Sequence, residues 1–213
     1  MTTDCHCHIL PGLDDGAQTL EESVFLAGKL AEWGYRRAVC TSHSTFKYRN
    51  SPQTVKAACD LLRGELERQR IDLELVPSME YRFIPETWPV VRENGWLMPW
   101  EGNHILVELP IHDPTKIGNL IPLAEIHRLL DEGYQPVLAH PERYLYLRME
   151  DFKAFKESGC QLQRNIGTLE GMYGETVRYR AEALDAEEMY DWIGTDLHNR
   201  KYADFFDRFV FAE

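Results

Sequence analysis

The sequence predicts an α/β fold: a distorted barrel of seven parallel strands in (β/α)7 order, with helices on the outside. Short apolar runs alternate with longer amphipathic stretches, the pattern of strands alternating with helices. Seven such units follow one another without a long detour, one fewer than in the eight-unit barrel. Residues suited to metal binding stand at the end of almost every apolar run.

The candidate strands are the seven short apolar runs. They lie at residues 3–8, 37–42, 73–79, 104–109, 135–139, 160–165 and 190–195. Because amphipathic stretches separate most of them, we expect repeated βα units and a parallel sheet.

The candidate helices follow from the helical period and from their end signals. In residues 20–33 the apolar side chains fall near one face, and Gly34 ends the helix. Ser51 followed by Pro52 has the form of an N-cap with Pro at the first helical position. Further helices are expected at 51–69, 116–131, 149–158 and 174–184, with 202–211 as helix or coil and 83–103 as a long loop around a short helix.

Composition limits the class of protein. With 213 residues, 44% of them hydrophobic and 27% charged, the chain fits one folded domain over 1–213. Its 23 Lys and Arg against 35 Asp and Glu give a net charge of −12, which disfavours broad nucleic-acid binding. No apolar run approaches the ~20 residues of a membrane span, and no signal peptide opens the chain, so we expect a cytoplasmic protein.

Residues suited to metal binding lie at the ends of the expected strands. The residues there that suit metal binding are His6, His8, His43, Glu80, Glu108, His140, Asp196 and His198. In a parallel barrel these ends share one face, where active sites lie, so residues far apart in sequence converge. The loop 10–16 can bring a further carboxylate over the same face.

The five cysteines do not point to a metal knot or a disulfide framework, because their number is odd and no CxxC spacing occurs. His6 and His8 lie two apart on a strand and so point to one side, while Cys5 and Cys7 point to the other. We expect reduced thiols.

Three other histidines have simpler explanations. His127 lies inside an expected helix, and His104 opens a strand at the end opposite to the predicted ligands. His112 is a loop residue that is less expected to contact substrate than the predicted ligands are. The tryptophans of the 83–103 loop, with Tyr81 and Phe83 nearby, either form an aromatic rim or pack the loop.

Taken in order, these motifs resemble the PHP (polymerase and histidinol phosphatase) superfamily over nearly the whole chain. The stretches concerned are 4–16, 41–43, Glu80, Glu108, 140–143 and 195–199. Within it, the His-x-His-x-Leu-Pro-Gly-x-Asp-Asp-Gly opening and the His-Pro-Glu-Arg motif are similar to the bacterial manganese-dependent tyrosine phosphatases of capsule and exopolysaccharide synthesis. The resemblance implies a PHP-type barrel.

The resemblance also implies three metal sites. The first would use His6, His8, Glu80 and Asp196, the second Glu80, Glu108 and His140, and the third Asp15, His43 and His198, with Asp14 as the alternative to Asp15. Mixed imidazole and carboxylate ligands suit Mn²⁺, Fe or Zn better than Mg²⁺ or Ca²⁺, and Mn²⁺ is our expectation.

Arg143 would bind the substrate phosphate, and Asp15, His43 and His198 would assist the leaving group. The second phosphate-binding arginine of the family usually lies several residues beyond the Asp-x-His-Asn motif. Here Arg200 follows Asn199 directly and is our candidate, with Lys201 and Arg208 left open. The residues beside His43 also depart from the family, since Ser42 and Ser44 replace the usual Pro and His.

The implied function is a protein-tyrosine phosphatase that hydrolyses phosphotyrosine by attack of a metal-bridging hydroxide. No cysteine is followed six positions later by arginine, so the Cys-x5-Arg loop of the cysteine-dependent phosphatases is absent. The expected substrate is the tail of a bacterial tyrosine kinase, and the oligomeric state is open. Two alternatives remain: a small-molecule phosphatase such as one for histidinol phosphate, and a non-catalytic PHP scaffold, although none of the nine ligands is missing.

Overall fold

The computed structural model describes residues 2–212. They divide into two compact units, the first made of Met1–Met79 with Gly194–Glu213 and the second of Glu80–Ile193. The boundary after Met79 falls inside the third strand rather than in a linker, and the first unit contains both ends of the chain. A single domain over 1–213 stays a prediction.

One sheet contains seven strands whose order in space is their order in the chain. They are β1 (Thr3–Cys7), β2 (Arg37–Ser44), β3 (Glu74–Arg82), β4 (His104–Glu108), β5 (Gln135–Ala139), β6 (Gln161–Asn165) and β7 (Trp192–Gly194). The pairs β1–β2, β3–β4, β4–β5 and β5–β6 are parallel. The residues after β7 return to β1, because Leu197 pairs in parallel with Cys7. This is the connectivity of a (β/α)7 barrel, and it confirms the expected fold class.

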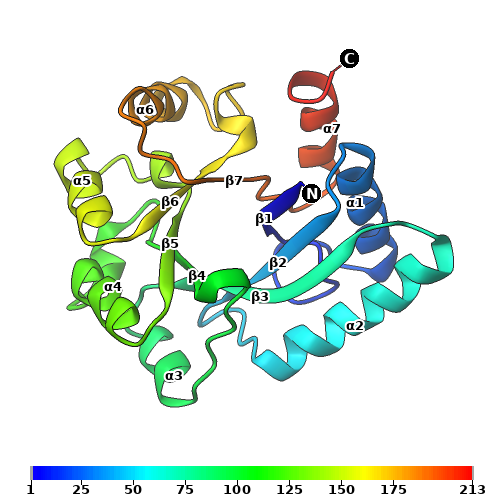
Figure 1. Cartoon of the computed structure of the whole chain (residues 1–213), viewed down its shortest axis with the longest axis horizontal. Helices are drawn as coiled ribbons and strands as arrows, with labels where there is room; N and C mark the ends of the chain where they lie inside the picture. The colour runs from blue at the N-terminus through cyan, green and yellow to red at the C-terminus, as the bar shows by residue number, and fades with distance from the viewer. Residues whose placement is uncertain (1, 213) are drawn as a thin grey trace. The chain divides into compact units, whose positions relative to one another are not determined.

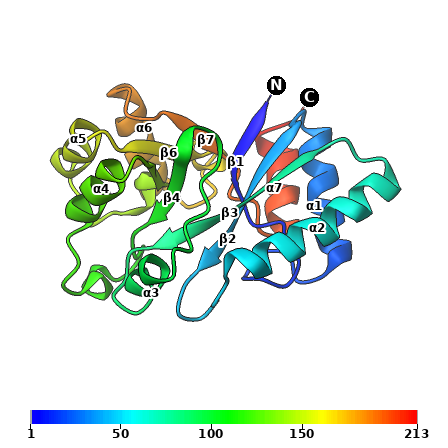
Figure 2. The same ribbon diagram turned by 60° about the horizontal axis from the view of Figure 1, so that its bottom comes forward.

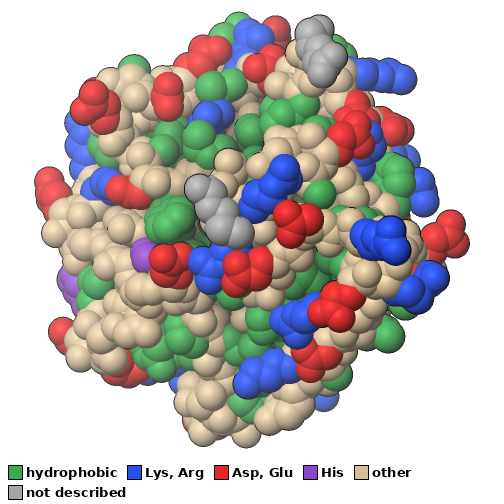
Figure 3. All heavy atoms as spheres, turned by 45° about the vertical axis from the view of Figure 1, so that its right-hand side comes forward, with side chains coloured by type: hydrophobic (Ala, Val, Ile, Leu, Met, Phe, Trp, Pro, Cys, Tyr) green, Lys and Arg blue, Asp and Glu red, His purple; other side chains and the backbone are tan. Residues whose placement is uncertain are grey.

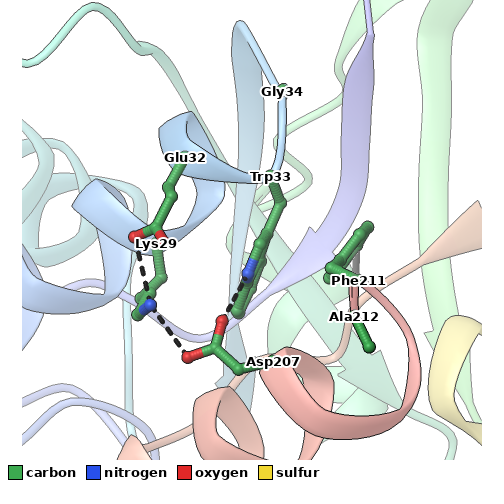
Figure 4. A pocket seen from close by; sticks show the side chains of 7 residues that line it. All are labelled: Lys29, Glu32, Trp33, Gly34, Asp207, Phe211 and Ala212. Atoms are coloured by element: carbon green, nitrogen blue, oxygen red, sulfur yellow. Dashed lines mark hydrogen bonds and ion pairs between the residues drawn. The ribbon is translucent and has the colours of Figure 1, made fainter.

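In the first unit, three helices accompany β1 and β2: α1 (Leu20–Glu32), α2 (Pro52–Gln69) and α7 (Arg200–Phe209). Helices α1 and α7 lie side by side in both views (Figures 1 and 2). Residues of α1 and α7 line a cavity of about 560 Å³. Figure 4 shows its lining, in which Lys29 forms ion pairs with Glu32 and Asp207. The Trp33 indole donates to Asp207 at 2.8 Å, and its ring stacks on Phe211. The C-terminal segment, for which the sequence left both helix and coil open, is helical, because it forms α7.

In the second unit, four helices follow the strands: α3 (Trp88–Glu93), α4 (Pro122–Asp131), α5 (Met149–Glu157) and α6 (Glu175–Ala186). Helices α4 and α5 pack beside each other (Figure 1). The expectation of one helix over 116–131 is wrong at its start. A short 3-10 turn, Pro114–Ile117, ends at Gly118 with φ +63°, and α4 begins only at Pro122. A positive φ interrupts a right-handed helix, and Pro favours its first turn.

The aromatic residues around 83–103 pack the interior. Tyr81 and Phe83 are fully buried, and the Trp88 indole donates to Glu125 at 2.9 Å. The Tyr81 hydroxyl donates to the Trp96 carbonyl and accepts from the Met98 amide. These rings therefore support the long loop, as the packing alternative predicted, and its short helix is α3.

All five cysteines are buried and free of disulfides. The Cys7 thiol donates to the Val39 carbonyl on β2 at 3.4 Å, on the side of β1 away from the histidines. Burial raises the pKa of both Cys5 and Cys7 well above its usual range. The prediction of reduced thiols that do not ligate metal agrees with this placement.

The surface carries mixed charge on the face shown in Figure 3, where basic and acidic side chains alternate without a large patch of either sign. Within residues 2–212, no helix has both the length and the apolar character needed to cross a bilayer.

Helix α2 begins with a complete capping box, since Ser51 Oγ accepts from the Thr54 amide and Thr54 Oγ1 accepts from the Ser51 amide. We expect Ser51→Ala to lower the free energy of unfolding by about 1 kcal/mol, because the first turn loses this acceptor. Urea denaturation measures the change. The exposed Gln53 in the same turn supplies the control, Gln53→Ala, which should alter stability little.

Candidate metal centre

Three predicted ligands meet in the first unit, at the end of β1 and just beyond β7. The Nε2 atoms of His6 and His8 are 3.0 Å apart. Asp196 Oδ1 lies 3.3 Å from His6 Nε2 and 3.5 Å from His8 Nε2. All three residues are at most 1% exposed. The side chains thus direct one donor atom each to a common point.

The spacing of these donor atoms fits a shared metal ion. Ligand atoms bound about 2.1 Å from one ion are about 3.0–3.4 Å apart at octahedral and tetrahedral angles. The three observed separations fall in or next to this range. Two imidazoles and a carboxylate suit Mn, Fe and Zn ions. The residues present therefore fit the implied metal.

A buried carboxylate orients His8. Asp14 Oδ2 lies 2.9 Å from His8 Nδ1 and accepts from the His43 amide, while Oδ1 accepts from the Gly16 amide. Burial raises the pKa of Asp14, but the charge and hydrogen bonding of His8 outweigh burial and lower it below the usual range. A carboxylate on Nδ1 leaves Nε2 of His8 for the metal. These contacts support Asp14 as a positioning residue for His8, and its role as the alternative ligand to Asp15 stays a prediction.

The close approach of the loop to His8 explains why the opening motif ends in a glycine, Gly16. A Cβ at this position would lie 2.0 Å from the carbonyl oxygen of His8 and 2.6 Å from its Cβ. Only glycine allows the loop to lie this close to His8. The loop in turn brings Asp14 to the imidazole.

The predicted third group also lies in the first unit. Asp15 Oδ1 is 3.5 Å from His43 Nε2 and 3.9 Å from His198 Nε2. The His198 ring stacks on His8 with centroids 4.0 Å apart. Burial, with the neighbouring imidazoles, lowers the pKa of His198 to about 4, so it is neutral at pH 7 as a metal ligand must be. The side chain of Asp15 is 56% exposed, which leaves room for an ion or a substrate beside it.

In the second unit, the predicted ligands Glu80, Glu108 and His140 come together. His140 Nε2 lies 3.2 Å from Glu80 Oε1 and 3.8 Å from Glu108 Oε1. The other oxygen of Glu108 accepts from Arg82, its register partner on β3. All three ligands are about 1% exposed. This group offers one imidazole and two carboxylates.

Two of the predicted ligands have an unusual backbone. His140 and Asp196, which follow β5 and β7, have φ values of +32° and +53°. Non-glycine residues in this region cost about 1–3 kcal/mol each and cluster at functional sites. The turn after each strand aims the side chain back toward its group.

A second buried carboxylate holds the turn that contains Arg143. Glu142 Oε1 accepts from the Asn165 amide and the Thr168 hydroxyl, each at 2.9 Å, and Oε2 accepts from the Tyr190 hydroxyl. The Arg143 guanidinium lies 4.7 Å from the centre of the Tyr173 ring. Glu142 therefore fixes the backbone from which Arg143 projects.

Arg200, the candidate second phosphate clamp, contacts α1. Its guanidinium lies 3.8 Å from the centre of the Phe25 ring, in a cavity that Glu21 and Glu65 also line. This cation–π contact occupies one face of the guanidinium. Substrate binding by Arg200 stays a prediction.

The three histidines outside the predicted ligand set occupy the helix, the strand start and the loop that the sequence predicts for them. His127 is exposed on α4, and the ring of His104, at the start of β4, lies against Trp100 and Trp192. His112 lines a cavity with Arg143.

Sequence reasoning missed four positioning residues: Asp4, Asp14, Arg82 and Glu142. Asp4 accepts from the Thr195 amide and hydroxyl and so joins β1 to the residues after β7; burial raises its pKa to about 6. Arg82 could have been found, because it lies two residues after Glu80 on a strand and so faces the same side. Each of the other three has at least one partner from a distant segment, namely Thr195 for Asp4, His43 for Asp14 and Asn165 for Glu142.

We expect Asp14→Asn to weaken Mn²⁺ binding by about 10–100-fold, because His8 loses a charged acceptor. Titration of the metal-free protein with Mn²⁺ measures the affinity. Asp72→Asn, an exposed position in the same unit, is the control. Unchanged affinity in Asp14→Asn would show that His8 does not need this carboxylate.

The family model described as capsular polysaccharide synthesis, CpsB/CapC, matches residues 2–203. Tyrosine-protein phosphatase YwqE of Bacillus subtilis is 31% identical over 206 residues, covering 95% of this chain and 79% of YwqE. Tyrosine-protein phosphatase CpsB of Streptococcus agalactiae is 25% identical, covering 92% and 82%.

A solved structure confirms the fold. It comes from work on YwqE from Bacillus subtilis and CpsB from Streptococcus pneumoniae, described as unique metal-dependent tyrosine phosphatases. The TM-score is 0.84 at 28% identity, over 100% of this chain and 89% of the other. The family model over residues 2–203 and the structural match over the whole chain show that this protein belongs to the CpsB/CapC family.

Proposed function

We propose that the chain is a metal-dependent protein-tyrosine phosphatase of capsular or exopolysaccharide synthesis. The observation that carries the proposal is the convergence of His6 Nε2, His8 Nε2 and Asp196 Oδ1 at 3.0–3.5 Å in a buried site. Relatives that match nearly the whole chain are named as tyrosine-protein phosphatases. Catalysis by a metal cluster accounts for both.

The proposed ligands form three sites. His6, His8 and Asp196 would hold the first ion, Glu80, Glu108 and His140 the second, and Asp15, His43 and His198 the third. The contacts within each unit support these groups. That all nine ligands are present disfavours a non-catalytic scaffold.

When bound, such ions supply hydroxide at neutral pH and screen the phosphoryl oxygens. Arg143 binds the phosphate, because a guanidinium fork can meet two phosphoryl oxygens at once. Asp15, His43 and His198 would hold the ion beside the leaving group, and departure of the tyrosinate, whose reference pKa is near 10, would need only modest help from a water molecule in that site. Asp14 and Arg82 hold the side chains of the ligands His8 and Glu108 in position.

Three finer statements belong to the same proposal. The ion is Mn²⁺, which fits mixed imidazole and carboxylate ligands. The protein works in the cytoplasm, and its substrate is the phosphorylated tail of a bacterial tyrosine kinase. Buried ligands at or near the ends of six strands support the metal, while the names of the relatives support the substrate class.

A substrate comparison tests the proposal. The Mn²⁺-loaded protein should hydrolyse a phosphotyrosine peptide faster than histidinol phosphate or a nucleotide monophosphate, and chelation should abolish turnover. Phosphate release measures both. Preference for histidinol phosphate would overturn the tyrosine phosphatase assignment, and full activity in the chelated protein would overturn the metal centre.

A further inference from the structure

A cavity of about 480 Å³ in the second unit adjoins two of the proposed ligands along the chain. One wall, with Ile111 and Pro114, follows Glu108. Another, with Leu145 and Tyr146, follows His140. The Tyr146 hydroxyl donates to the Pro110 carbonyl at 2.8 Å, which ties the two walls together. The cavity is therefore built on the segments that leave the metal-binding strand ends.

The cavity is largely apolar. Ile111, Pro114, Leu145 and Val177 line it, and Leu145 is 46% exposed although it is a large aliphatic side chain. Tyr146 and Tyr173 add two ring surfaces. Concave apolar sites with few polar groups are the usual form of small-ligand pockets.

One fixed cation lies in this apolar wall. Arg143 lines the cavity with its guanidinium over Tyr173, and the Tyr173 hydroxyl accepts from Asn165 Nδ2 at 3.0 Å. Glu142, the residue before Arg143 in the chain, anchors the turn through three hydrogen bonds. Both the ring beneath Arg143 and the backbone behind it are thus held in place.

The lining selects by charge. Arg143 and His112 are its only residues with titratable nitrogen, and none of the lining residues is Asp or Glu. An ammonium group in this cavity would find no counter-charge, whereas an anion at its edge would meet Arg143. An aromatic ring that carries a phosphate matches both features, whereas an amine-bearing alkyl phosphate offers the anion but brings an ammonium group that the lining does not neutralise.

We infer that this cavity is the subsite for the aryl ring of the substrate, with Arg143 at its phosphate end. The inference rests on the proposed function and extends it, because it assigns Val177, Ile111, Leu145 and Tyr173 to selecting aryl over alkyl phosphates. These residues touch the ring and take no part in metal binding.

Val177→Phe tests the subsite by filling the cavity from α6, and Val90→Phe, at an exposed valine of α3 outside the cavity, is the matched control. Calorimetry measures binding of phenylphosphonate and methylphosphonate, which are not hydrolysed, to the Mn²⁺-loaded proteins. We expect the wild type to bind phenylphosphonate about tenfold more tightly than methylphosphonate, because the ring is buried. Val177→Phe should remove this preference and leave methylphosphonate affinity unchanged, while Val90→Phe should keep both.

The outcomes separate the subsite from the activity. A phenyl preference that is absent in the wild type, or that survives in Val177→Phe, overturns the subsite even if phosphotyrosine is hydrolysed. Loss of the preference in Val177→Phe alone supports the subsite even if no phosphate ester is turned over. For an active enzyme, Val177→Phe should also raise KM for phosphotyrosine with kcat little changed, without affecting inhibition by inorganic phosphate.

Discussion

Asp196→Asn should lower turnover of a phosphotyrosine peptide by about a thousandfold, equivalent to about 4 kcal/mol in the activation free energy. Asp196 Oδ1 lies within 3.5 Å of the proposed ligand atoms His6 Nε2 and His8 Nε2 and 3.4 Å from His198 Nδ1, so its charge acts on one proposed ion site directly and on a ligand of another. An amide has nearly the same shape but removes that charge. Asparagine also tolerates the positive φ of this position, so the backbone should be preserved.

Two further measurements, of metal content and of folding, show whether the lost turnover of Asp196→Asn comes from lost metal or from a lost fold. Elemental analysis should show fewer bound ions per chain in Asp196→Asn, while circular dichroism should show an intact fold. Asp204→Asn, at an exposed position of α7, is the matched control and should keep both metal and activity. Full turnover in Asp196→Asn would mean that the cluster has been assigned incorrectly.

Arg143→Ala should lower kcat/KM for phosphotyrosine by about 100-fold, since loss of one charged donor to a developing oxyanion costs about 10²–10³ in rate. Arg143→Lys should recover only part of this loss, because an ammonium cannot form the paired hydrogen bonds of a guanidinium. The guanidinium is held over Tyr173, so the fork is oriented before substrate arrives.

Steady-state kinetics with phosphotyrosine and inhibition by inorganic phosphate measure the effect of Arg143. Phosphate inhibition should weaken in parallel with kcat/KM, which a purely structural role would not produce. Arg128→Ala, at an exposed arginine of α4 in the same unit, is the control. Equal activity of Arg143→Ala and Arg128→Ala would exclude Arg143 from phosphate binding.

The fold was predictable where local signals and tertiary packing agree. The Ser51-Pro52 pair marks the start of α2, and the capping box forms there. The strand at residues 135–139 was also predicted with its observed bounds. The helix expected over 116–131 failed because apolar periodicity does not detect a glycine at φ +63°.

The site was predictable as a set of strand-end residues and not as a geometry. Asp14 and Asp15 are adjacent and chemically identical in sequence. Their roles separate only through tertiary contacts, since Asp14 is fixed by the amide of His43 on β2 while Asp15 faces the imidazoles of His43 and His198. The stacking of Arg200 on Phe25 likewise depends on how α7 packs beside α1.

Cysteine and histidine side chains alternate along β1, and this arrangement has a consequence for resistance to oxidants. Thiolates that are exposed and have a low pKa react with peroxide and alkylating agents. Here every cysteine is buried, and those that alternate with His6 and His8 have raised pKa values. A phosphatase built in this way has no thiol nucleophile to lose, so peroxide at levels that inactivate cysteine-dependent phosphatases should leave its cysteines reduced and its capacity to remove phosphate intact.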